Sequence, residues 1–113
     1  MYSPITWLNS TTTAYTIAVA DVGKTLILNG GATAQTITVP TSTNYPSGYE
    51  VAILSHGSGA GVRKIVFSTG SNVYMYGESK LTAPTLQLAN SAMVALKKIA
   101  SDLWIVTGPA EVV

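Results

Sequence analysis

Cysteine is missing from the 113-residue chain. Without thiols the chain can form neither a disulfide framework nor a thiolate zinc site, so a hydrophobic core has to stabilise its fold. A chain of this length is one domain by size and buries about two-thirds of its unfolded surface, which suffices for such a core. The lack of cysteine fits assembly in a reducing cytoplasm, and we expect neither a metal nor a cofactor.

Charge is scarce as well. Charged residues make up 10% of the chain and its net charge is +1, whereas about 25% is usual for a soluble domain. Nucleic-acid binding needs a clustered basic footprint, and we interpret the two basic doublets, at 63–64 and 97–98, as exposed strand ends. We therefore expect no nucleic-acid partner. A surface of Ser, Thr, Asn and Gly is typical of subunits that pack against one another.

Apolar runs long enough to cross a membrane are also absent. No run approaches the about 20 residues that a spanning helix needs, and residues 1–4 lack the basic start of a signal peptide. We expect no membrane partner and no secretion by the usual route. The glycosylation sequon at 9–11 is accordingly interpreted as a chance match.

What the sequence does contain is an alternation of apolar and polar residues with a period of two, which predicts β-strands. Asp21 to Lys24 and Asn29 to Gly31 supply turns between the first strands. The predicted strands cover 5–8, 15–19, 25–28, 35–39, 49–53, 63–67, 73–76, 81–88, 92–99 and 103–107. Counting the first and the Pro84-containing one as marginal, about nine short strands predict a single-domain β-sandwich.

Three segments of the chain are expected to differ in role. Residues 1–13 lack sustained alternation and are predicted to form an N-terminal arm, 14–108 the sandwich domain, and 109–113 a C-terminal extension. Trp7 and Leu8 are too apolar to remain in water, so the arm either caps the core or docks on a partner. The arm is therefore a possible attachment segment. The segment 92–99 also suits a helix, but the turn at 101–102 that leads straight into the last strand favours a strand.

Two strands are apolar on both faces. In the run 26–28, Ile27 points away from the face that its leucine neighbours share, and the run 103–106 has Trp104 on one face and Ile105 on the other. One face can join the core, and the second needs a second sheet or another subunit to cover it. Candidate contacts with a partner protein or with another subunit are Trp7, Leu8, Ile27 and Trp104.

The order of these features resembles a module that is common in bacteriophage fibre, spike and head-decoration proteins. The residues that carry the resemblance are T-x-x-D-x-G-K-x-L-x-L-N at 18–29 with alanine first, I-T-V-P at 37–40, G-Y-E-V-A-I-L at 48–54, the Gly-rich hairpin at 57–61, the strand 92–96 and S-D-L-W-I-V-T-G at 101–108. The resemblance implies an all-β, jelly-roll-like sandwich that often works as a trimer on the virion surface. It supplies no catalytic residues.

Motifs that could carry chemistry are weak. Gly23-Lys24-Thr25 would need a glycine at Ala18 and a following helix to bind phosphate, so we interpret Lys24 as a turn residue. His56 is the sole histidine and lacks partners for a metal site. The carboxylates are interpreted as solvated turn or strand residues: Asp21, Glu50, Glu78, Asp102 and Glu111. Asp21 and Asp102 lie in predicted turns, where a carboxylate is expected to accept backbone N–H bonds. Glu50 and Glu78 could face each other as in a glycosidase.

Tyrosines are the more suggestive candidates. Tyr45, Tyr49, Tyr74 and Tyr76 could offer flat faces on which sugars stack, or could serve as packing and interface residues. From the resemblance to phage modules, we predict a non-enzymatic virion protein, a capsid decoration or cement protein that binds the head as a homotrimer. It would assemble in the host cytoplasm and have itself and other virion proteins as partners. The alternative is a receptor-binding module of a tail fibre or spike that recognises a host-surface glycan.

Overall fold

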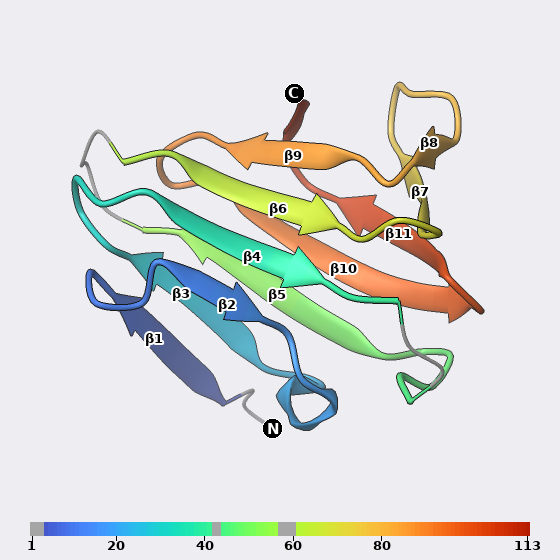
Figure 1. Cartoon of the computed structure of the whole chain (residues 1–113), viewed down its shortest axis with the longest axis horizontal. Helices are drawn as coiled ribbons and strands as arrows, with labels where there is room; N and C mark the ends of the chain where they lie inside the picture. Colours follow the sequence, from blue (N-terminus) through green and yellow to red (C-terminus); the bar gives the residue numbers. More distant parts are fainter. Residues whose placement is uncertain (1–3, 42–43, 57–60) are drawn as a thin grey trace.

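Two β-sheets packed face to face make up the fold, as Figure 1 shows. The computed structural model describes residues 4–41, 44–56 and 61–113. Sheet A has seven strands in the order β1 (Ile5–Asn9), β3 (Thr25–Asn29), β5 (Glu50–Ser55), β10 (Met93–Ala100), β11 (Leu103–Thr107), β7 (Asn72–Met75) and β8 (Leu81–Thr82). Sheet B has five in the order β12 (Glu111–Val112), β9 (Thr85–Leu88), β6 (Arg63–Phe67), β4 (Gln35–Val39) and β2 (Ala14–Thr16).

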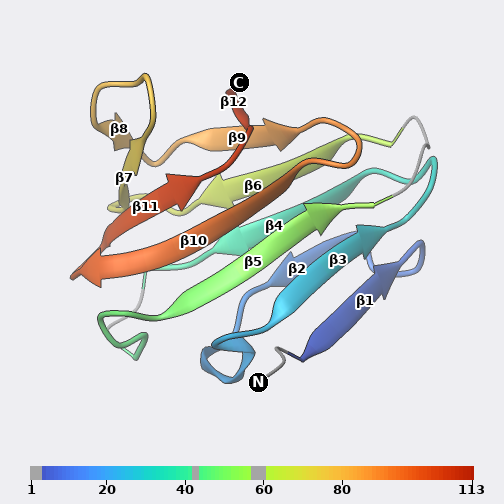
Figure 2. The same ribbon diagram turned by 180° about the vertical axis from the view of Figure 1, so that it is seen from behind.

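The first six strands wind in the manner of a β-solenoid, which we call the coil of β1 to β6. The chain alternates between the two sheets from β1 to β6, and the strands of successive turns lie parallel within each sheet (Figures 1 and 2). In sheet A, Ile5 pairs with Thr25 and Thr25 pairs with Ala52, so the two turns differ in length. The later strands β9, β10, β11 and β12 make antiparallel pairings that complete both sheets.

The prediction of an all-β sandwich is confirmed, with corrections to its details. There are twelve strands among the described residues, where about nine were expected. The pairing does not show the jelly-roll-like connectivity, because five of the ten pairings are parallel whereas a jelly roll is built from antiparallel strands. The predicted strand 81–88 is split at Pro84 into β8 and β9, which belong to different sheets.

Both predicted end segments contribute strands. β1 lies within the predicted arm and forms the edge of sheet A beside β3. β12 lies within the predicted extension and pairs with β9. The predicted strand 15–19 is shorter than expected, because η1 (Val19–Asp21), a single 3-10 turn, follows β2. No helix among the described residues is long and apolar enough to span a membrane.

The core lies between the sheets and is built from the inward positions of the alternating strands. At one end of it an aromatic cluster gathers around Trp104, whose ring lies 5.9 Å from that of Tyr49 and 6.3 Å from that of Phe67, centre to centre. Both contacts are edge-on, the arrangement that aromatic rings favour. Trp104 is 1% exposed, so this cluster is part of the core.

Two buried polar side chains close the opposite end of the core. Gln35 donates hydrogen bonds to the carbonyls of Leu8, Asn9 and Thr12, and its Oε1 accepts one from Gly30 N–H at 2.9 Å. A Cβ at position 30 would lie 2.7 Å from the Gln35 side chain, so glycine is required for this approach.

Arg63 stands next to Gln35 in the parallel pairing of β4 and β6. Arg63 is 1% exposed and Lys98 is 4% exposed, so the interpretation of the two basic doublets as exposed strand ends is wrong for these two residues. The Arg63 guanidinium donates to the carbonyls of Gly31 and Thr33, at 2.7 and 2.8 Å. Gln35 thus binds carbonyls at the β1–β2 connection, and Arg63 binds carbonyls at the β3–β4 connection. In each case the side chain lies one winding further along the coil than the carbonyls that it binds. These bonds hold successive windings in register.

Candidate interaction face

The outward side of sheet A is predominantly apolar. One row across four neighbouring strands consists of Trp7, Ile27, Leu54 and Met93, each opposite the next in the strand pairing. Trp7 and Met93 are each 54% exposed and flank the two inner members of the row. A second row is formed by small and apolar residues: Ile5, Thr25, Ala52 and Ala95. We call this surface the outer face of sheet A.

Ile27 lies on this outer face, as its alternation with the core leucines predicted. It is 5% exposed, yet it is not part of the core cluster between the sheets. Its pairing partners Trp7 and Leu54 stand on either side of it on the same face. Neighbouring side chains of the same sheet therefore cover Ile27, and the residue offers little surface of its own to a partner.

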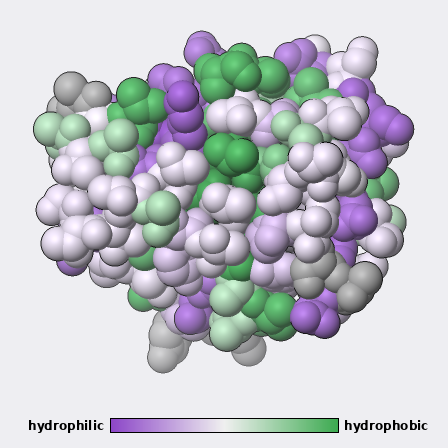
Figure 3. Space-filling view, viewed as in Figure 1, coloured by the Kyte–Doolittle hydropathy of each residue, from purple (hydrophilic) through white to green (hydrophobic). Residues whose placement is uncertain are grey.

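The outward side of sheet B has a different character. Its strand positions form rows rich in threonine and other polar residues: Thr16, Thr38, Val66 and Thr85 in one, and Ala14, Thr36, Lys64 and Gln87 in the other. Figure 3, viewed from the sheet B side, shows mostly pale residues of intermediate hydropathy. The sandwich thus has one apolar and one polar broad face.

Two of the four predicted contact residues belong to the core. Leu8 and Trp104 point between the sheets and are buried there. Both side chains are therefore inaccessible to a partner of the folded chain. The pattern alone could not decide which side of a doubly apolar strand faces inward. Trp7 is the exposed member of the predicted set.

Two of the predicted sugar-stacking tyrosines are also in the core. Tyr45 and Tyr49 are buried with their rings 5.0 Å apart, so their faces are covered. The Tyr45 hydroxyl donates to the carbonyl of Ile17, and the Tyr49 hydroxyl donates to that of Ala18 at 2.6 Å. These two hydrogen bonds hold the backbone of residues 17–18, just before η1, against the core. Burial, followed by the charge of Asp21, raises the pKa of both phenols.

The polar corner around Asp21 is built as a turn, as expected, but Asp21 is 3% exposed, so the expectation that its carboxylate is solvated is wrong. Its carboxylate accepts hydrogen bonds from the Ala18 N–H at 2.9 Å and from the Tyr15 hydroxyl at 2.7 Å, and Lys24 Nζ lies 3.5 Å away. Burial and the bond to Asp21 raise the pKa of Tyr15 to about 12. Gly23 has a φ of +76°, which the turn requires. Lys24 is thus a turn residue, as predicted, with Asp21 as its ion-pair partner.

The other two tyrosines lie at the surface, at the margin of the outer face of sheet A. Tyr74 is 44% and Tyr76 98% exposed. They line a hollow of about 280 Å³ together with Glu78 and, from β11, Ile105 and Thr107. This arrangement places aromatic faces, a carboxylate and a hydroxyl around one depression.

His56 has neighbours that its isolation in the sequence concealed. Its ring meets that of Trp7 edge-on at 5.3 Å, and its Nδ1 lies 2.8 Å from Oδ1 of Asn29. The three residues come from, or directly follow, three adjacent strands of sheet A. Asn29 and His56 form the polar margin of the apolar row that begins at Trp7. The predicted loop 57–60 beyond His56 lies outside the described residues.

Glu50 and Glu78, the two carboxylates of the glycosidase alternative, line different hollows. Glu50 lines a small hollow of about 90 Å³ beside Lys24, whereas Glu78 lines the hollow beside Tyr76. In sheet A, β10 and β11 lie between β5, which contains Glu50, and β7, which precedes Glu78 in the chain. The described part of the chain contains no cluster of three or more His, Asp or Glu side chains that could hold a metal ion.

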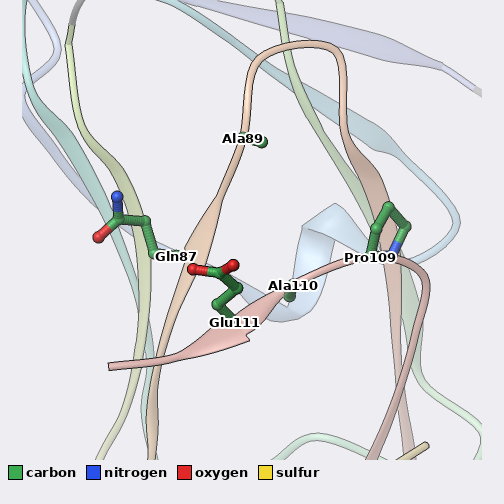
Figure 4. A pocket seen from close by; sticks show the side chains of 5 residues that line it. All are labelled: Gln87, Ala89, Pro109, Ala110 and Glu111. Carbon is green, nitrogen blue, oxygen red and sulfur yellow. The ribbon is translucent and has the colours of Figure 1, made fainter.

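A further hollow, of about 310 Å³, lies where the C-terminal segment crosses β9 (Figure 4). It is lined by Gln87, Ala89, Pro109, Ala110 and Glu111. Figure 4 shows the Glu111 carboxylate and the Gln87 amide as the polar groups around it. Two short polar side chains and small apolar ones define no particular ligand.

No protein-family model matches the chain, and no curated protein matches it.

Proposed function

We propose that the chain is a non-enzymatic structural protein of a bacteriophage particle that decorates the head surface as a homo-oligomer. The observation that carries the proposal is the outer face of sheet A, where Trp7 and Met93 expose more than half of their surface around an apolar row. Large contiguous apolar patches mark surfaces that other proteins cover. The resemblance to phage decoration modules supplies the particle, the virion location and a trimer as the expected oligomer.

Purified virions offer the direct test. We expect the chain among the proteins of washed particles, and we expect added wild-type protein to cosediment with particles that lack it. Trp7→Lys should reduce cosedimentation at least tenfold, because it places a charge in the apolar row through which the homo-oligomer that binds the head assembles. Lys64→Glu, a charge change on the outward side of sheet B, serves as the matched control and should bind normally. Absence of the chain from washed virions would refute the proposal.

Attachment through the predicted arm is best tested by point substitution. β1 is an integral strand of sheet A and Leu8 is part of the core, so truncation of residues 1–13 would disturb the fold itself. Trp7→Lys changes only the exposed side of β1. Its effect on particle binding therefore reports on the outward side of β1 without removing a strand.

A second candidate function is glycan recognition by a fibre or spike, which the hollow beside Tyr74 and Tyr76 favours. Exposed aromatic rings next to a carboxylate and a hydroxyl are groups that can stack on and hydrogen-bond to a sugar. If this function holds, the wild-type chain binds host-surface glycans on an array and Tyr76→Ala loses that binding, whereas Trp7→Lys keeps it. Binding to particles with no signal on the array favours the decoration role.

A further inference from the structure

The outer face of sheet A has its smallest side chains at its centre. Strands β5 and β10 are the middle pair of the six strands from β1 to β7. Ala52 lies opposite Ala95 across this pair, and one step along the strands Leu54 lies opposite Met93. Alanine at the centre allows a second sheet to approach closely, while the larger side chains of the apolar row can pack around it.

The charges on this face are balanced. In the described strands of sheet A, the outward positions carry one carboxylate, Glu50, and one ammonium group, Lys97. These two residues lie opposite each other on the central strands, next to the alanine pair. A face with one charge of each sign is electrostatically complementary to a copy of itself. It offers no cluster of like charges that would attract a strongly charged partner.

We propose that the partner that covers this face is the same face of a second copy of the chain, related by a two-fold axis parallel to the strands between β5 and β10. Rotation about this axis places β5 of one copy over β10 of the other. Glu50 then faces Lys97 of the partner subunit, and the two alanine positions meet at the axis. The inference rests on the proposed assembly role and identifies the partner in it.

The available area is sufficient for a stable pair. The broad faces of the sandwich span the two longer extents of the molecule, 34 and 31 Å (Figure 1). Full face-to-face contact would cover on the order of 800 Å² per copy, which matches a standard-size interface. One opposing copy covers such a face completely, so the surface geometry points to a pair rather than the trimer that the resemblance implies.

Sedimentation equilibrium of the purified full chain, from about 10 to about 100 μM, tests this pair. We expect wild-type protein to sediment at twice its chain mass of 11.8 kDa. Lys97→Glu and Glu50→Lys should each raise the dissociation constant at least tenfold, because each places like charges opposite each other. The double exchange should return it to within about threefold of wild type, since the complementarity is restored.

Lys64→Glu is the matched control and should leave the dissociation constant within about twofold. Circular dichroism checks that every variant is folded, which exposed positions permit. A wild-type monomer at about 100 μM, a trimer, or a double exchange that fails to restore association would each overturn the inference. Any of these results with normal cosedimentation on virions would leave the proposed decoration role intact.

Discussion

At the residue scale, the amide of Gln35 satisfies backbone groups from two turns that are far apart in the sequence. It binds carbonyls of the β1–β2 turn and the Gly30 N–H of the β3–β4 turn, and it is 1% exposed. A buried carbonyl that loses its donor cannot regain it from water. The Gln35 side chain is therefore expected to contribute more to stability than an apolar side chain of the same size.

Gln35→Leu keeps the volume and removes these hydrogen bonds. We expect the free energy of unfolding to fall by about 3 kcal/mol, since the buried Leu8 carbonyl and Gly30 N–H lose their partner, as do the part-buried carbonyls of Asn9 and Thr12. Urea denaturation measures the change. Gln87→Leu, on the outward side of sheet B, is the control and should change stability by less than about 0.5 kcal/mol. A Gln35→Leu variant as stable as wild type would contradict the role assigned to this side chain.

The tyrosines that fasten the Asp21 corner predict a dependence of stability on alkaline pH. Burial and the hydrogen bond to Asp21 raise the pKa of Tyr15 from 10.0 to about 12, and the pKa values of Tyr45 and Tyr49 are raised as well. Because the folded state holds these protons more tightly than the unfolded state, their stabilisation is complete below pH 10 and declines as the pH rises toward 12.

Urea midpoints at about pH 9 and about pH 11 measure this decline. We expect a lower midpoint at the higher pH and a smaller difference in Tyr15→Phe, which lacks one of the phenols. An equal loss in wild type and in Tyr15→Phe would show that the effect arises elsewhere.

For individual residues, the sequence predicted which side chains share one side of a strand, but not which side faces the core. The sequence placed Ile27 opposite its leucine neighbours, and the structure agrees. It could not assign Trp104 to the core, because a strand that is apolar on both sides gives no sign of which side faces inward. It could not assign Leu8 either, because residues 1–13 lack sustained alternation. Met93, Ala52 and Ala95 were missed as members of the outer face, although their alternation with the buried residues next to them carried that signal.

At the element scale, the strands were largely predictable and their order was not. Residues 92–99 were correctly predicted as strand, and β10 covers most of them. The coil of six strands left no repeat in the sequence, because its turns differ in length: Ile5 aligns with Thr25, and Thr25 with Ala52. Short strands such as β8 and β12 have two residues each, too few for a periodic pattern.

The two sides of β1 give an element-scale prediction. Leu8 points into the core and Trp7 outward, so Leu8→Ala should lower the free energy of unfolding by about 3 kcal/mol. Trp7→Ala should cost less than about 1 kcal/mol in the single chain, because its ring is half exposed. Chemical denaturation at low protein concentration compares them. Equal losses would mean that β1 does not present one side to the core.

At the scale of the whole molecule, the sandwich separates an apolar face from a threonine-rich one. The sequence predicted a surface with few charges, but it did not predict that apolar and polar residues would be divided between the two broad faces. Which outward residues share a face depends on which sheet each strand joins, and the winding of the chain determines that. That division makes the proposed assembly one-sided: sheet A is covered and sheet B remains in water. A particle coated in this way would present mainly hydroxyl groups to its surroundings.

The coil also determines how the molecule would bear mechanical load. The N-terminal strands β1 and β2 and the C-terminal strand β12 lie at opposite edges of the sheets (Figure 1). Tension between residues 4 and 113 therefore runs across the strands and would peel them off one after another. We expect optical-trap extension to show several small steps at low force, and one abrupt rupture would contradict this. A subunit held by its broad face, by contrast, would spread shear over many strands at once.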